Sequence, residues 1–156
     1  MRSIIKNPQL TLKSLNIAST QISGQSLEFF LDDLIQNRTL KHLDLGMLEG
    51  SSLKNPLGVQ GAVCISALLI KNKNIESLSL NNNDFGAEGG ECIGIALMDN
   101  DTLKGLKVAD NQLRSEGAIQ IIKNAVHLYQ LNLAKNYLKS DVAKPIAKLL
   151  KNSNNL

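Results

Sequence analysis

Residues 75–103 read IESLSLNNNDFGAEGGECIGIALMDNDTL, and this stretch combines two hydrophobic periods. Leu78 and Leu80 alternate with polar residues, a two-residue period that is typical of a β-strand. Ile93 and Leu97 are then four residues apart, which is the spacing of a buried helix face. The stretch therefore predicts one structural unit made of a short strand, a turn, a helix and a return loop.

The same unit recurs along the chain. Its strand half follows the pattern L-x-x-L-x-L-x-x-N-x-L. Five copies predict strands near residues 13–18, 41–46, 76–81, 104–109 and 129–134. The asparagine position holds Thr20 in the first unit and then Asn55, Asn83, Asn111 and Asn136. The first, third and fifth units are each 28 residues long, which leaves room for a helix in each unit.

With these residues, the chain resembles the ribonuclease-inhibitor-like class of leucine-rich repeats, which occurs also in immune receptors and bacterial effector proteins. The resemblance covers nearly all of residues 1–156 and implies one domain. It also implies an α/β leucine-rich-repeat solenoid, a curved right-handed β-α superhelix. Parallel strands would line its concave face and helices its convex face.

Some positions of the unit have an expected structural role. The four asparagines should form a buried ladder that bonds backbone groups where each strand ends, so Asn83→Ala or Asn111→Ala should cost about 1–3 kcal/mol. Gly61, Gly89 and Gly117 share a position early in the helix, where we expect helix and sheet to approach closely. Ile146 and Leu150 match the core positions of earlier helices.

Two units depart from the standard length. The second has seven additional residues around 48–54, with the sequence LEGSSLK, between strand and helix. This insertion is either a solvated loop or a binding loop on the rim that offers Leu48 and Leu53 to a partner. The fourth unit is only 25 residues long, which predicts a helix shortened by about one turn and a dent in the convex surface.

The two ends lack an obvious cap. Ile4 and Ile5 precede Asn7-Pro8, and the chain stops at Leu156, the first position of a sixth unit. Because a terminal repeat exposes its apolar edge, either the chain is a fragment of a longer array or another chain covers the ends, for example by self-association. We favour the fragment.

Side chains between the leucines of each strand should point to the concave face. That face is small, polar and of mixed charge, so it can form hydrogen bonds along a protein partner. It lacks large aromatic anchors apart from one tyrosine at a strand edge. The predicted partner-binding residues are His42, Asp44, Ser77, Ser79, Asn81, Asn82, Lys107, Asp110, Tyr129 and Asn132.

No catalytic or cofactor site is indicated. His42 and Asp44 beside Ser77 suggest a hydrolase, but an open concave sheet offers no oxyanion hole, so we prefer a solvated polar surface. The glycines of NNNDFGAEGGE match neither common phosphate-binding motif. No group of histidines and cysteines has metal-ligand spacing. We therefore expect no enzymatic activity, no cofactor and no metal.

Composition sets further bounds. The net charge of +3, without a basic row or stacking aromatics on the concave face, argues against nucleic-acid binding. No apolar run reaches the roughly 20 residues of a membrane span, and the start does not read as a signal peptide. Cys64 and Cys92 do not make a disulfide framework. A cytoplasmic setting is expected, which is the host cytoplasm if the protein is injected, and secretion without a standard signal stays open.

The last predicted helix is basic. It carries one acidic residue, Asp141, against Lys139, Lys144, Lys148 and Lys151. A solvated face is the preferred interpretation of this cluster. The alternative is a basic patch for an acidic protein or a membrane surface.

The leading functional hypothesis is a non-enzymatic protein–protein interaction module that binds a partner on its concave face and rim loops. The resemblance implies two settings: a bacterial effector in a host cell, toward which the Lys-, Asn- and Ile-rich composition leans, or a ligand-sensing fragment of an innate immune receptor. A second hypothesis is a regulator of a small GTPase or other enzyme, with Arg38 and Arg114 as the loop candidates.

Overall fold

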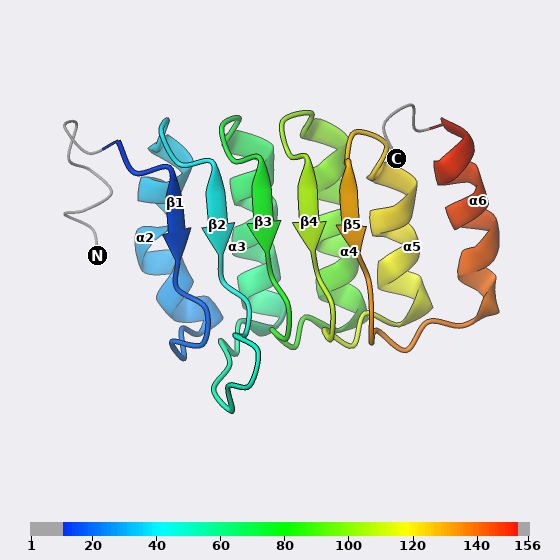
Figure 1. Ribbon diagram of the computed structural model, residues 1–156, viewed down its shortest axis with the longest axis horizontal. Coiled ribbons are helices and arrows are strands. Elements are labelled where there is room, and N and C mark those ends of the chain that lie inside the picture. Colours follow the sequence, from blue (N-terminus) through cyan, green and yellow to red (C-terminus); the bar gives the residue numbers. More distant parts are fainter. Residues whose placement is uncertain (1–10, 153–156) are drawn as a thin grey trace.

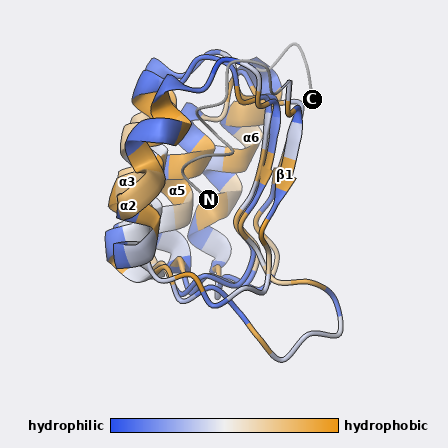
Figure 2. Ribbon diagram, turned by 90° about the vertical axis from the view of Figure 1, so that its left-hand side faces the viewer, coloured by the Kyte–Doolittle hydropathy of each residue, from blue (hydrophilic) through white to orange (hydrophobic). Residues whose placement is uncertain are grey.

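Strands and helices alternate along the chain and form two layers in the computed structural model, which describes residues 11–152 (Figures 1 and 2). The five strands make one parallel sheet in sequence order. They are β1 Ser14–Asn16, β2 His42–Asp44, β3 Ser77–Ser79, β4 Gly105–Lys107 and β5 Gln130–Asn132. Each lies within its predicted range, and the predicted α/β solenoid with parallel strands is confirmed. The predictions on Ile4, Ile5, Asn7-Pro8 and Leu156 lie outside the described residues.

The helices lie side by side on the other layer (Figure 1). They are α2 Gly24–Gln36, α3 Gly58–Lys71, α4 Gly86–Ala96 with the 3₁₀ turn η1 Leu97–Asp99, α5 Arg114–Asn124, and α6 Ala143–Asn152 after the 3₁₀ turn η2 Ser140–Val142. Helices α3, α4 and α5 each begin directly after the last apolar residue of the strand motif, which is buried in all three units: Leu57, Phe85 and Leu113. The motif thus fixes both the strand and the start of the next helix.

One hydrophobic core, mostly aliphatic, runs between the two layers. The leucines that alternate with polar residues in the strands point into it, including Leu43, Leu78 and Leu106, and helix residues such as Ile65 and Ile93 meet them from the other layer. Since each unit buries its apolar face against its neighbours, the core continues through the array.

The glycine prediction needs correction. A Cβ atom on Gly117 would lie 2.6 Å from the Ala87 carbonyl oxygen, and one on Gly90 would lie 2.9 Å from the Gly117 Cα. A Cβ on Gly94 would lie 2.5 Å from the Gln120 carbonyl carbon. Gly90, Gly94 and Gly117 therefore allow α4 and α5 to approach closely. A Cβ on Gly61 or Gly89 would instead lie 2.4 or 2.8 Å from the Cβ of Leu57 or Phe85, the last apolar residue of the strand motif in the same unit.

The last helix also differs from the sequence prediction. Ile146 and Leu150 are 36% and 61% exposed, whereas Val142 and Leu149 are buried. The core positions of one repeat are covered by the next repeat, and no strand follows α6 within the described residues. The same part of the chain contains no helix long and apolar enough to cross a membrane.

Candidate binding surface

Five of the predicted partner-binding residues lie together on the exposed face of the sheet. The strand register places His42 beside Ser77, and Asp44, Ser79 and Lys107 in one row. These residues line a hollow of about 190 Å³, together with Ser14, Asn16 and Leu43. The hollow is therefore polar and spans four adjacent strands, β1 to β4.

Three side chains of this face help to end their strands. Each accepts a hydrogen bond from the backbone N–H two residues further on: Asn16 from Ala18 (2.9 Å), Asp44 from Gly46 (2.9 Å) and Asn132 from Ala134 (3.0 Å). Such local bonds compete with sheet pairing and favour a turn. The second carboxylate oxygen of Asp44 forms no hydrogen bond with another described residue. The bond of the first oxygen to Gly46 was not predicted from the sequence.

The predicted residues nearer the strand ends are bonded to one another or to the next strand. The Asn81 side-chain oxygen accepts from the Ala109 N–H at 2.9 Å. The Asn82 amide donates to the Asp110 carboxylate at 3.3 Å, and both residues have positive φ angles, which asparagine and aspartate tolerate better than most residues. These three side chains have less bonding capacity left for a partner than those in the hollow.

Sequence reasoning missed an ion-pair row directly before the strands. The Glu76 carboxylate lies 2.9 Å from the Lys41 ammonium and 3.4 Å from the Lys104 ammonium. Hydrogen bonds from Lys41 and then Lys104 hold the pKa of Glu76 below its ordinary value. Tyr129 occupies the same repeat position beside Lys104 and is 55% exposed, so it is an accessible aromatic side chain at this edge. The signal was available, because all four residues follow the first leucine position of their units.

The insertion at 48–54 forms a defined loop at the rim. Leu48 and Leu53 are 49% and 47% exposed. The loop is tied at both ends, since the Leu48 N–H donates to the Ser19 hydroxyl at 2.9 Å and Lys54 pairs with Asp84. Figure 2 shows the loop extending beyond the sheet on the strand side. The loop therefore carries two exposed leucines at the rim of the array.

The four motif asparagines are buried where the strands end. Each bonds backbone carbonyls through its amide nitrogen, for example Asn55 to Ile17 and Leu45, both at 2.9 Å. The side-chain oxygen of Asn111 accepts from the Asn83 N–H at 2.8 Å, and that of Asn136 accepts from the Asn111 N–H at 2.8 Å. The Asn83 side-chain oxygen has no partner among the described residues. The ladder is thus interrupted at the unit that follows the insertion.

The described residues contain no cluster of three or more histidine, cysteine or acidic side chains that could hold a metal ion. Cys64 and Cys92 are free thiols. Burial raises the pKa of the Cys64 thiol, and the Glu28 carboxylate acts in the same direction. The thiol is buried against α2, 4.0 Å from the Gly24 carbonyl oxygen, so it lies in the helix layer and away from the strand hollow.

The repeat geometry agrees with a comparison of the sequence with known families. A family model described as "Leucine Rich repeat" matches residues 71–94, which span β3 and most of α4. The chain is a leucine-rich repeat protein. The matched residues include Leu78, Leu80 and Asn83, which are the motif positions that point into the core.

One similar protein matches only part of the chain. The human protein "NACHT, LRR and PYD domains-containing protein 14" is 29% identical over 106 residues, which cover 54% of this chain. The aligned part is only 10% of that relative's length.

Two solved structures match nearly the whole fold. "Leiomodin-1 Actin-Binding Site 2" superposes with a TM-score of 0.77 at 22% identity, covering 97% of this chain and 86% of that one. The tropomodulin C-terminal domain of Caenorhabditis elegans has a TM-score of 0.75 at 9% identity, covering 97% and 90%. At these identities the two structures establish the likeness of the fold alone.

Proposed function

We propose that the chain is a protein-binding module without catalytic activity, which holds a partner on its concave face and against the 48–54 loop. The observation that carries the proposal is the polar hollow lined by His42, Asp44 and Lys107 beside a loop that presents two exposed leucines. Repeat folds of this kind have extended concave surfaces that bind partners.

The hollow and the loop supply different parts of the interaction. Hydroxyl, imidazole, carboxylate and ammonium groups in the hollow can pair with polar groups of a partner and set its register. Leu48 and Leu53 can supply apolar area at the rim. Because hydrogen bonds and an ion pair already hold the loop, its ordering on binding should cost little free energy.

The similar structures suggest a first partner to test. One of them carries a title that describes an actin-binding site, so actin is the first candidate. The biological setting stays a prediction. The Lys-, Asn- and Ile-rich composition supports a bacterial effector in the host cytoplasm. The similarity to a human NACHT, LRR and PYD domains-containing protein supports a fragment of an immune sensor. No observation favours a GTPase regulator. Its two candidate residues do not lie together, because Arg38 precedes β2 and Arg114 follows β4, at opposite ends of the parallel strands.

Partner capture by matched variants tests the proposal. The immobilised chain is incubated with purified actin and, separately, with cell lysate, and bound proteins are identified by mass spectrometry. D44N/K107Q changes the hollow while keeping the acceptor that Gly46 needs, and L48S/L53S changes the loop. K13Q/K71Q is the control, because it removes two exposed lysines outside both features.

We expect D44N/K107Q and L48S/L53S each to lower the affinity for the captured partner at least about tenfold, as loss of central interface contacts does. The control should bind like the unaltered chain. A partner that binds both altered chains as well as the control would refute the proposed surface.

A further inference from the structure

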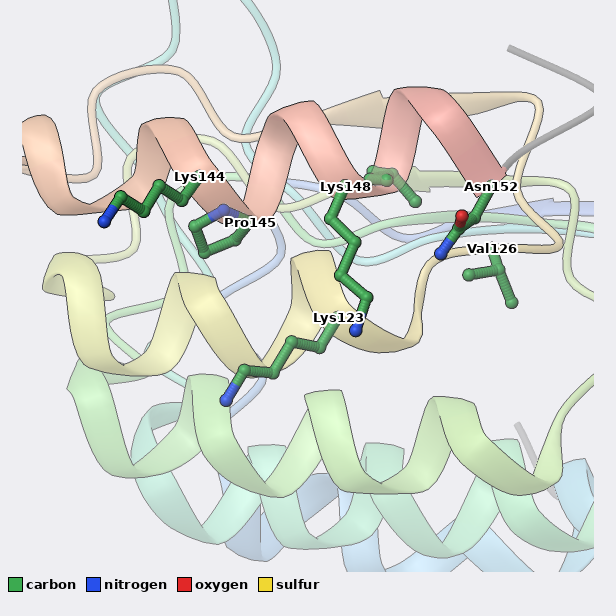
Figure 3. Close-up of a pocket in the computed structure, with 7 residues that line it drawn as sticks. Lys123, Val126, Lys144, Pro145, Lys148 and Asn152 are labelled. Carbon is green, nitrogen blue, oxygen red and sulfur yellow. The ribbon is translucent and has the colours of Figure 1, made fainter.

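A second hollow lies in the helical layer, between α5 and α6 (Figure 3). Its volume is about 360 Å³. The floor is apolar, with Leu149 buried and Val126 and Pro145 half-buried. The polar residues that line it are Asn152, Lys123, Lys144 and Lys148. Figure 3 shows Lys148 extending from α6 toward α5, which carries Lys123.

The hollow lies beside the helix of the shortened fourth unit. Helix α5 has 11 residues, whereas α3 has 14, and α5 ends at Asn124 beside the hollow. The hollow therefore lies at the end of the helix of the shortened unit and extends along α6.

The charge of this hollow is not balanced by its surroundings. Lys123, Lys144 and Lys148 are exposed, and none of the three forms an ion pair with another described residue. The acidic side chain of η2, Asp141, accepts a hydrogen bond from Ser115 at 2.6 Å and does not line the hollow. Like charges around a recess concentrate a positive potential, which attracts anions.

We propose that the α5–α6 hollow binds an acidic segment of a partner protein, with an apolar side chain on its floor and carboxylates on its lysines. The volume is at the lower end of the roughly 300–1,000 Å³ range of ligand sites, which suits a few side chains of a peptide. The apolar floor favours an acidic segment that also carries leucine or a similar residue over a purely polar anion. The recessed shape favours a protruding side chain over a flat bilayer surface.

Fluorescence anisotropy with a labelled synthetic peptide tests this inference. The probe is a short run of glutamates around two leucines. One control peptide has glutamine for glutamate, and another has serine for leucine. We expect saturable binding of the probe that weakens as salt rises, and weaker binding of both control peptides.

Variants locate the site. K123Q/K148Q should weaken probe binding about fivefold, because two exposed ion pairs are lost. K13Q/K71Q removes the same charge elsewhere and should leave the affinity unchanged. D44N/K107Q should also leave it unchanged, so this result is independent of the concave-face proposal.

Four results would overturn the inference: no saturable binding up to about 1 mM, equal binding of the glutamine peptide, equal weakening by K13Q/K71Q, or binding to vesicles of anionic lipid without binding to the peptide. The vesicle arm uses phosphatidylserine vesicles with the unaltered chain.

Discussion

Asn111 and Asn83 occupy the same motif position, but their hydrogen bonds differ enough to predict unequal effects of mutation. The Asn111 side chain accepts from the Asn83 N–H at 2.8 Å and donates to the Leu80 carbonyl at 2.7 Å and the Ala109 carbonyl at 3.1 Å. In Asn111→Ala, the buried Asn83 N–H and the Leu80 carbonyl lose their side-chain partner. A buried group left unsatisfied costs about 1–3 kcal/mol, so the expected loss is about 3 kcal/mol.

Asn83 makes weaker bonds and fewer of them. Its amide donates to the carbonyls of Leu45 and Asn81 at 3.2 and 3.3 Å, and its oxygen has no partner among the described residues. The Leu45 carbonyl keeps a second donor, the Asn55 amide at 2.9 Å. Asn83→Ala should therefore cost only about 1 kcal/mol.

Urea unfolding followed by circular dichroism measures both changes. We expect the free energy of unfolding to differ between the two variants by about 2 kcal/mol, with the slope against urea unchanged. Gln60→Ala, an exposed amide on α3, is the control and should not move the midpoint. Equal losses for the two asparagine variants, or a larger loss for Asn83→Ala, would show that the break in the ladder has no energetic meaning.

Two further predictions use the same unfolding measurement. Gly94→Ala should destabilise the fold by about 2 kcal/mol, because its Cβ would lie 2.5 Å from the backbone of Gln120. Gly105→Ala, whose Cβ would meet nothing closer than 3.7 Å, is its control, and equal losses would contradict the close approach of α4 and α5. Arg114→Gly should stabilise the fold by about 1 kcal/mol, because Arg114 has φ +52°, a left-handed conformation that costs free energy for a residue with a Cβ atom. Gly58 and Gly86 hold the same position in other units. A lower urea midpoint for this variant would contradict the prediction.

The features that could be predicted from the sequence are those that depend on whether a side chain points into the core or to solvent. The two-residue period of Leu78 and Leu80 reports which side of a strand is buried, and a recurring motif keeps the same residue buried in each unit. The positions of the strands and the burial of the asparagines could therefore be predicted. Contacts between units could not, because they depend on the separation of neighbouring helices and strands.

The glycines illustrate that limit. The shared position of Gly61, Gly89 and Gly117 could be read from the sequence, but the atoms that each approaches could not. Gly117 meets the backbone of α4, whereas Gly61 and Gly89 lie nearest the Leu57 and Phe85 side chains that precede their own helices. The double role of Asp44, on the hollow and in a bond to Gly46, was hidden for a similar reason. A pattern gives the direction of a side chain and not the number of hydrogen bonds it has already formed.

Both candidate surfaces arise where the repeat length changes. The insertion before Asn55 places the 48–54 loop beside the strand hollow. It also coincides with the break in the asparagine ladder. The Thr20 N–H donates to the Asn55 side chain and the Asn83 N–H to the Asn111 side chain, but the Asn83 side-chain oxygen accepts no bond from Asn55. The shortened unit ends at the hollow between α5 and α6. In a repeat array each unit contacts only its neighbours, so a change of length is absorbed locally and the sheet register continues on both sides. The irregular units can therefore acquire binding features at little cost to the fold, which is why we place both proposed interactions there.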